Sequence, residues 1–215
     1  MNRRLLLIVI ACLLLVQSYS FAQAQDLPKF EVAGEFTTLE RDVFGEQRTE
    51  PGVGARFTFN FNRSLAFETA GYFFPKQCNP CRNGGNMSQV LAGAKVGKRF
   101  EKWGIFAKAR PGVVSFSRGE FNAVRITPGG PFPVEIETNR ITSFATDLGG
   151  VLEFYPSPKI VTRFDVSDTI IHFRSRTING IGFNPITNEF TLVPFTRPAR
   201  TTHNFQFIAG VGFRF

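Results

Sequence analysis

The sequence predicts an all-β fold: an eight-stranded antiparallel up-and-down β-barrel that spans a membrane. Three observations lead to this prediction. Apolar residues alternate with polar or small residues at a period of two, which is the period of a β-strand. The connections between the alternating segments are short and long in turn. Beyond the N-terminal segment, no stretch stays apolar for the roughly 18–20 residues that a spanning helix needs.

The composition fits a folded chain. Of 215 residues, 43% are hydrophobic and 14% aromatic, with 26 Phe. That apolar fraction excludes a disordered chain. The mean hydropathy of −0.04 then requires polar residues placed regularly among the apolar ones. The formal charge is +8, but basic and acidic residues are interleaved and form no recognised motif, so no nucleic-acid partner is expected.

The first 24 residues are predicted to be a secretory signal peptide. Asn2-Arg3-Arg4 is positively charged, Leu5 to Val16 is an apolar run, and Ala22-Gln23-Ala24 is a small-x-small cleavage signature. A lipoprotein signal is the competing interpretation because Cys12 follows a short apolar tripeptide, but Cys12 would interrupt the apolar run rather than end it. We therefore expect export, removal of residues 1–24, and one barrel domain over 25–215.

Eight strands are predicted from the alternation. Most reach the ~9–11 residues of a tilted membrane strand and exceed the ~5–6 residues common in soluble proteins. Their predicted ranges are 29–39, 52–62, 64–74, 88–98, 104–116, 140–154, 159–171 and 202–215.

The connections indicate a membrane topology. Three are short: Asn62-Arg63-Ser64, Arg99 to Trp103, and Tyr155 to Pro158. Short periplasmic turns and long extracellular loops are typical of an outer-membrane barrel, so the protein is expected in the outer membrane. The long links are 40–51, 75–87, 117–139 and 172–201.

Three further features bear on this topology. Four aromatic residues near the short turns fit an interfacial girdle: Phe100, Trp103, Phe154 and Tyr155. Val134 to Glu137 and Thr187 to Val193 resemble strands within the long links and are expected to form hairpins above the membrane; if they crossed it instead, the barrel would have ten strands. Pro111 lacks an amide hydrogen and should mark a bulge or the membrane rim.

The polar face of the strands is predicted to line the lumen. It carries six basic and six acidic residues, and an eight-stranded bore is only wide enough for side chains to fill. Buried charges are tolerable only when they are paired, so a lumenal charge network is expected. Its predicted members are Glu31, Glu35, Arg56, Glu68, Lys95, Lys108, Arg110, Asp147, Glu153, Arg163, Asp165 and Arg214.

The C-terminal residues carry a resemblance to a known family. Gly210, Phe213 and Phe215 match the spacing of the C-terminal signal of bacterial outer-membrane barrels, whereas Ile208 stands where that signal favours a polar residue. With its layout and both ends, the chain resembles the small OmpA-like outer-membrane β-barrel family. The resemblance implies recognition by the barrel-assembly machinery. OmpA itself adds a C-terminal periplasmic peptidoglycan-binding domain, which is not expected here, so the resemblance does not imply that activity.

Two local patterns invite chemical interpretations. Cys78-Asn79-Pro80-Cys81 favours a short disulfide between Cys78 and Cys81 in an exported loop, with a metal site and a redox centre as alternatives. His172 lies near Asp165, Asp168 and Ser175 in sequence, but a catalytic group is defined by geometry rather than proximity. We expect no enzyme, no catalytic residue, no metal and no cofactor.

The expected role is structural or surface-interacting, through long extracellular loops. The link 172–201 carries Arg174, Arg176, Arg197 and Arg200, and the link 75–87 carries Lys76 and Arg82. Such basic loops could meet lipopolysaccharide phosphates or simply be solvated. Outer-membrane lipid, lipopolysaccharide and an unknown extracellular ligand are the expected partners. A narrow pore for ions or small solutes is the alternative; a lipid-modifying enzyme and a soluble lipocalin-like carrier are weaker ones.

Overall fold

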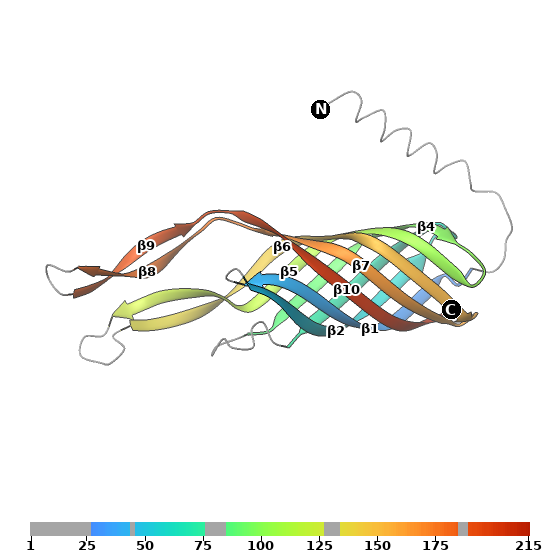
Figure 1. Cartoon of the computed structure of the whole chain (residues 1–215), viewed down its shortest axis with the longest axis horizontal. Helices are drawn as coiled ribbons and strands as arrows, with labels where there is room; N and C mark the ends of the chain where they lie inside the picture. Colours follow the sequence, from blue (N-terminus) through green and yellow to red (C-terminus); the bar gives the residue numbers. More distant parts are fainter. Residues whose placement is uncertain (1–26, 44–45, 76–84, 127–133, 185–188) are drawn as a thin grey trace, which may run out of the picture.

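The computed structural model describes residues 27–43, 46–75, 85–126, 134–184 and 189–215. These residues form ten β-strands (Figure 1). The expected leader, 1–24, lies outside the described residues. Within the described part, no helix is long and apolar enough to cross a membrane.

Eight strands close into an antiparallel barrel in the order β1-β10-β7-β6-β5-β4-β3-β2. The seam joins the first and last strands, with Glu31 opposite Arg214 and Leu39 opposite Gln206. Because every strand has two neighbours, the barrel leaves no open edge. The strands are β1 (Phe30–Val43), β2 (Glu46–Asn60), β3 (Leu65–Phe74), β4 (Met87–Arg99), β5 (Trp103–Ile126), β6 (Val134–Ser157), β7 (Ile160–Phe173) and β10 (Arg200–Arg214). The predicted all-β, eight-stranded antiparallel barrel is therefore confirmed.

Several predicted loops are instead continuations of strands. β1 and β2 stay paired up to Val43 and Glu46, so the link 40–51 is mostly strand. β5 and β6 likewise pair through most of 117–139, with register shifts after Phe116 and after Ala123. The prediction ended these strands where the apolar alternation fades, whereas backbone pairing continues into more polar sequence.

The predicted loop 172–201 contains a separate two-stranded sheet. β8 (Arg176–Asn184) pairs with β9 (Glu189–Arg197) and takes no part in closing the barrel. Figure 1 shows this ribbon and the end of the β5–β6 pair projecting from the same end of the barrel, opposite the C-terminus. We call the two projections the β8–β9 ribbon and the β5–β6 ribbon. Ten strands therefore exist, but eight form the barrel.

The short turns lie close to where they were predicted. The Asn62 side-chain oxygen accepts hydrogen bonds from the backbone N–H groups of Ser64 and Leu65, at 2.8 Å each, which closes the β2–β3 turn. Strands β4 and β5 are joined through 100–102, and β6 and β7 through 158–159. All three turns lie at the barrel end opposite the ribbons.

Pro111 lies at an irregularity in the wall. The β4–β5 pairing skips from Leu91 with Gly112 to Ala94 with Ala109, so Pro111 has no paired residue on β4, whereas on β6 it pairs with Thr146. The residue without an N–H thus lies where the β4–β5 ladder is interrupted. Gly93 occupies the same interval, and a Cβ atom there would lie 2.0 Å from the Ala109 carbonyl oxygen. Close approach of the two strands therefore requires glycine at position 93.

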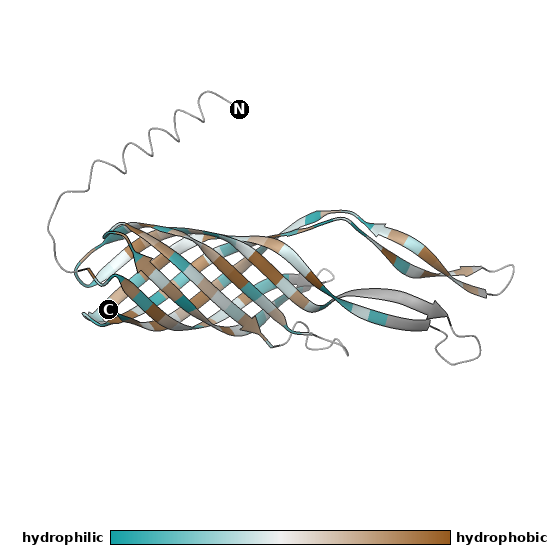
Figure 2. Ribbon diagram, turned by 180° about the vertical axis from the view of Figure 1, so that it is seen from behind, coloured by the Kyte–Doolittle hydropathy of each residue, from teal (hydrophilic) through white to brown (hydrophobic). Residues whose placement is uncertain are grey.

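The outer wall of the barrel is apolar, and Figure 2 shows hydrophobic and hydrophilic residues alternating along the barrel strands. Large hydrophobic side chains on every barrel strand point away from the interior and are exposed, including Phe213 and Phe215 at 66% each. We call this surface the apolar belt. It includes Phe30, Val32, Phe36, Val53, Phe57, Leu65, Phe67, Phe73, Val90, Val96, Ile105, Val113, Phe144, Leu148, Leu152, Phe164, Val166, Phe205, Val211, Phe213 and Phe215.

Aromatic side chains border this belt at the turn end. Phe100 and Trp103 stack with ring centroids 4.2 Å apart and are exposed, as is Phe154. Tyr155, which the sequence placed with them, instead points inward and is 9% exposed. Its position one residue after the outward Phe154 explains the difference, because neighbours in a strand face opposite sides.

Candidate functional site

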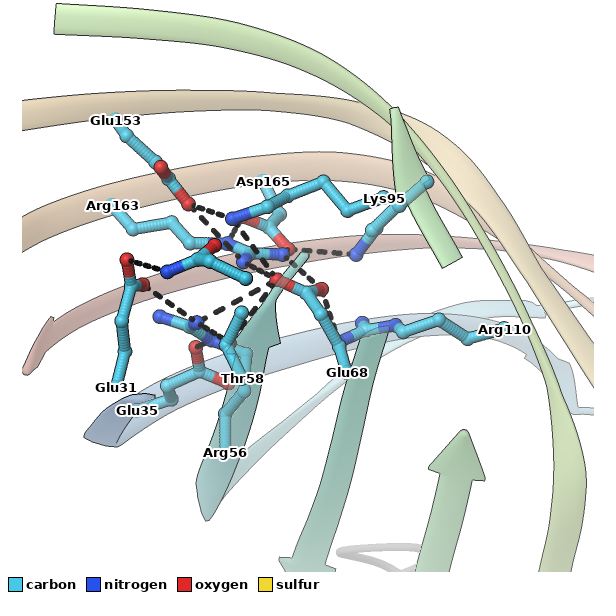
Figure 3. A network of polar contacts seen from close by, with 12 residues as sticks. Glu31, Glu35, Arg56, Thr58, Glu68, Lys95, Arg110, Glu153, Arg163 and Asp165 are labelled. Atoms are coloured by element: carbon cyan, nitrogen blue, oxygen red, sulfur yellow. Dashed lines mark hydrogen bonds and ion pairs between the residues drawn. The ribbon is translucent and has the colours of Figure 1, made fainter. Parts of the chain in front are cut away.

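The interior of the barrel holds all twelve charged residues expected there. Each is buried, and Glu31, Glu68, Arg110, Asp147, Glu153 and Arg163 expose no surface. They come from all eight barrel strands, because alternate residues of each strand face inward. We call this group the charge network, and Figure 3 shows the part of it around Glu68.

Glu68 is the centre of the charge network. Its carboxylate binds the Arg163 guanidinium through both oxygens. Lys95 Nζ lies 3.2 Å from Oε1, and Arg56 Nη1 lies 3.6 Å from the same atom. Arg110 Nη1 lies 3.8 Å from Oε2. The single negative charge of Glu68 therefore lies close to four positively charged side chains, which come from four different strands.

The remaining pairs surround this centre. Arg56 Nε donates to Glu35 at 2.7 Å, and the Tyr72 hydroxyl donates to the other Glu35 oxygen at 2.7 Å. Lys95 also contacts Glu153. Each of these groups therefore has an opposite charge or a hydroxyl within reach, which a buried charge requires.

A second cluster of pairs completes the network. Lys108 Nζ lies between two carboxylates, 2.8 Å from Asp165 Oδ2 and 3.0 Å from Asp147 Oδ2. Arg110 donates to Asp147 Oδ2 through Nη2 at 2.6 Å and Nε at 2.9 Å. Arg163 donates to Asp165, with Nη2 at 2.8 Å from Oδ2. Arginine bound through two nitrogens is held in one orientation.

Sequence reasoning missed Arg99 as an interior residue. Its side chain is 6% exposed, with Nη2 3.4 Å from Glu31 Oε1 and Nε donating to the Tyr155 hydroxyl at 2.9 Å. The predicted strand ended at residue 98, which left Arg99 to the turn. Its spacing of four from Lys95 on the same strand places both on one face and was the available signal.

Sequence reasoning also missed a second, uncharged half of the interior. Toward the ribbon end, the inward positions are filled by apolar side chains, which we call the apolar layer. Between it and the charge network, Gln206 donates to Thr37 at 2.9 Å and accepts from Thr169 at 2.6 Å. The apolar layer comprises Leu39, Ala70, Tyr72, Phe74, Met87, Leu91, Val114, Phe116, Ile141, Ala145, Ile171 and Ile208, with Phe173 packed against it.

An ion pair covers the apolar layer. Arg41 lies 4.7 Å above the Phe116 ring and 3.1 Å from the Glu50 carboxylate. Burial raises the pKa of the Glu50 carboxyl above its ordinary value, against the opposing effect of Arg41. From the turn end to the ribbon end, the bore is thus filled first by the charge network, then by amide and hydroxyl groups, then by the apolar layer, and last by the Arg41–Glu50 pair.

The polar residues near His172 in sequence do not lie together in the structure. Asp165 is buried inside the barrel. His172 lies on the outer side, where its Nδ1 is 3.1 Å from the Thr201 hydroxyl. Ser175 donates to the Arg197 carbonyl, and Asp168 pairs with His203 at 2.6 Å. The four residues face different neighbours, so this arrangement provides no Ser–His–Asp relay.

The cysteine motif cannot be placed, because Cys78 and Cys81 lie outside the described residues, as do Lys76 and Arg82. Among the described residues, no group of three or more His, Cys, Asp or Glu side chains is arranged to hold a metal ion.

The C-terminal residues lie in β10 at the seam. Phe213 and Phe215 project outward into the apolar belt, whereas a Cβ atom on Gly210 would lie 2.7 Å from the Glu35 side chain. Ile208 is fully buried in the apolar layer. Its inward position explains why an apolar residue stands where the sequence signal favours a polar one.

A closed eight-stranded β-barrel with an apolar exterior and a buried charge network in its interior has the two faces of its strands reversed relative to a soluble barrel. Comparison with solved structures agrees with this fold. The chain is similar to Neisserial surface protein A, with a TM-score of 0.53 and 11% identity, over 87% of this chain and 97% of that one.

Two further similarities are weaker. Ail of Yersinia pestis, solved in complex with the heparin analogue sucrose octasulfate, matches with a TM-score of 0.49 and 11% identity over 86% of this chain and 97% of that one. The outer membrane protein OprG of Pseudomonas aeruginosa matches with a TM-score of 0.43 and 12% identity over 86% and 95%. No protein-family model and no curated protein sequence matches the chain.

Proposed function

We propose that this protein is an integral outer-membrane β-barrel with a structural or surface-interaction role. The observation that carries the proposal is the orientation of the two faces of the barrel strands. Phe and Val side chains lie on the outside of the barrel and paired charged side chains lie inside it, which is the reverse of a soluble barrel. Exposed apolar surface on this scale has no stable place in water, whereas lipid accommodates it and a closed barrel satisfies every backbone group. A lipocalin-like carrier would need the opposite arrangement.

A filled bore favours this role over a pore. Arg163 and Glu68 occupy the charged half, and Phe74 and Leu91 occupy the apolar half, all with at most about 1% of the side chain exposed. An ion would have to cross the apolar layer without ligands, which is costly. The charge network therefore serves stability and a single packed interior rather than conduction.

The β8–β9 ribbon is the proposed contact surface at the cell exterior. Phe183 and Phe190 pair across its strands, with ring centroids 5.2 Å apart, and both are about half exposed. Val193 and Phe195 are also exposed. Arg174 and Arg197 near its base are exposed, which suits contact with lipopolysaccharide phosphates. Apolar side chains held outside the membrane indicate an extracellular partner.

Biogenesis follows from the same proposal. Export by the N-terminal signal would deliver the chain to the periplasm, where Phe213 and Phe215 at the end of β10 would be recognised by the barrel-assembly machinery. Both side chains are outward and exposed, so they remain available until lipid covers them.

Two measurements test this function. In planar bilayers, the folded protein should give no conductance steps; a steady conductance that persists after the ribbons are replaced would establish the pore instead. In vesicle flotation, the protein in nanodiscs should bind lipopolysaccharide-containing vesicles, and R174Q/R197Q should weaken binding. K29Q/K159Q, which removes two exposed positive charges at the turn end, is the matched control. Equal binding by both variants would rule out the ribbon as the contact.

A further inference from the structure

A pocket of about 830 Å³ opens at the turn end of the barrel. Its walls come from all three short turns, through Arg63, Lys102 and Pro158, and from the ends of the seam strands, through Pro28 and Arg214. The volume is that of an ordinary small-molecule site, which spans roughly 300–1,000 Å³. Nothing in the proposed structural role uses this pocket.

The deepest cations of the pocket have too few counter-charges. Arg99 and Arg214, each with 6% of the side chain exposed, both approach the same oxygen of Glu31, at 3.4 and 3.3 Å. Arg99 also lies 3.6 Å from Glu153, but that carboxylate is bound to Lys95. Among the described residues, the buried Arg99 Nη1 donates no hydrogen bond, and Arg214 Nε, which makes the 3.3 Å approach to Glu31 Oε1, shares that oxygen with Arg99.

Both guanidinium groups are held in place. They lie over the Tyr155 ring, at 5.5 Å for Arg99 and 4.3 Å for Arg214, and Arg99 Nε donates to the Tyr155 hydroxyl. Cation–π contact and a hydrogen bond fix orientation before any ligand arrives, which lowers the entropy cost of binding. The pocket therefore presents prearranged donors beside an aromatic ring.

The mouth of the pocket also carries charged and aromatic side chains. Lys102 is exposed there, with Glu101 as the acidic residue beside it, and Phe100 adds a second aromatic wall. Four cationic residues and one acidic residue line the pocket: Arg63, Arg99, Lys102 and Arg214 against Glu101. This set matches an anion attached to an apolar, ring-like body.

We infer that this pocket binds an anionic ligand, a carboxylate or phosphate group on an apolar body. The inference depends on the proposed membrane insertion only for the assignment of the pocket to the periplasmic side. The expected binding chemistry depends only on the residues that line the pocket. The anion would give Arg99 Nη1 an acceptor and would add a second negative charge to the Glu31 carboxylate that Arg99 and Arg214 share, and the body would lie against Tyr155 and Phe100. An inner-leaflet lipid headgroup and a soluble periplasmic anion share this chemistry.

Trp103 provides the readout. It is the chain's single Trp and stacks on Phe100, which lines the pocket, so ligand binding should change its fluorescence. Benzoate and phenyl phosphate are the probes, and benzyl alcohol is the neutral probe of similar shape. Titrations use folded protein in phosphatidylcholine nanodiscs, with heat-dependent gel mobility verifying the fold of each sample independently of binding.

Substitutions of two exposed pocket residues, Lys102 and Glu101, should change the affinity for the anionic probes in opposite directions. K102Q should weaken benzoate and phenyl phosphate binding by about fivefold, the size of one surface charge interaction, and E101Q should strengthen it. R174Q, the same charge change at the opposite end, should leave binding unchanged. Saturable binding that benzyl alcohol does not reproduce supports the inference. No saturation by about 10 mM, or equal affinity in K102Q and E101Q, would overturn it even if the barrel is folded and inserted.

The source of the anion is resolved in the same assay. If phosphatidylglycerol nanodiscs compete with phenyl phosphate, the ligand class is a lipid headgroup. If they do not, while free benzoate still binds, it is a soluble anion. Both results support an anion site at the turn end.

Discussion

Glu68→Gln should strongly destabilise the barrel. The substitution preserves shape but removes the negative charge that faces Arg163, Lys95, Arg56 and Arg110. No surface of Glu68 is exposed, so water cannot replace the lost charge. Arg163 keeps Asp165 as a partner, whereas Lys95 retains only Glu153.

The magnitude follows from breaking a buried ion pair. Removing one partner of such a pair costs roughly 3–5 kcal/mol, because the other charge stays buried without compensation. At 1.4 kcal/mol for each tenfold change, the folded-to-unfolded ratio should fall by a factor of about 10² to several thousand. Glu68→Gln combined with Arg163→Gln should cost less than the two changes added together, since the two residues interact directly.

Urea unfolding in detergent micelles, followed by Trp103 fluorescence, measures this change. Glu40→Gln is the matched control, because Glu40 is an exposed acid on β1 and its loss should move stability by less than about 0.5 kcal/mol. If Glu68→Gln unfolds at the same urea concentration as Glu40→Gln, the charge network does not stabilise the barrel and the argument from burial is wrong.

Three further predictions follow from the wall, the interior and the ribbon. Gly93→Val should prevent strand closure and abolish the unheated fast-migrating gel band, whereas Gly71→Val, with no atom within 4 Å of the added Cβ, should keep it. Phe74→Ala should lower the free energy of unfolding by about 3–5 kcal/mol in urea titrations, because Phe74 is fully buried, and should cost more than Phe73→Ala on the exposed face. Replacing 176–197 by a short linker should leave heat-dependent mobility intact, because this ribbon lies outside the barrel sheet; loss of the barrel would show that the ribbon is needed for folding.

The sequence predicted the closed barrel because alternation and turn spacing are local signals. An alternation with a period of two assigns each side chain to one face of its strand. Glu68 and Arg163 could therefore be placed on the polar face although their contact was not known. Their direct contact depends on which strands lie across the bore, and one sequence does not give that arrangement. Asn62 marked its turn because its side chain satisfies two neighbouring amides.

The features that were not predicted from the sequence also have physical explanations. Leu39 shares its face with Glu31 and Glu35, yet the interior was expected to contain only paired charges, so the apolar layer was missed. Arg99 was missed because the predicted strand ended one residue early. Hairpins were expected within the links 117–139 and 172–201, and paired strands lie there. Their length was underestimated because the apolar alternation fades, whereas pairing in the β5–β6 ribbon needs only backbone groups.

The most direct test of the central claim is the gel mobility of protein taken from the isolated outer-membrane fraction, before and after boiling in SDS. A sealed barrel with lipid-facing Phe side chains should be found in that fraction and migrate faster when unheated. Recovery in the soluble periplasmic fraction, with identical mobility before and after boiling, would contradict both the closed barrel and the outward-facing apolar belt.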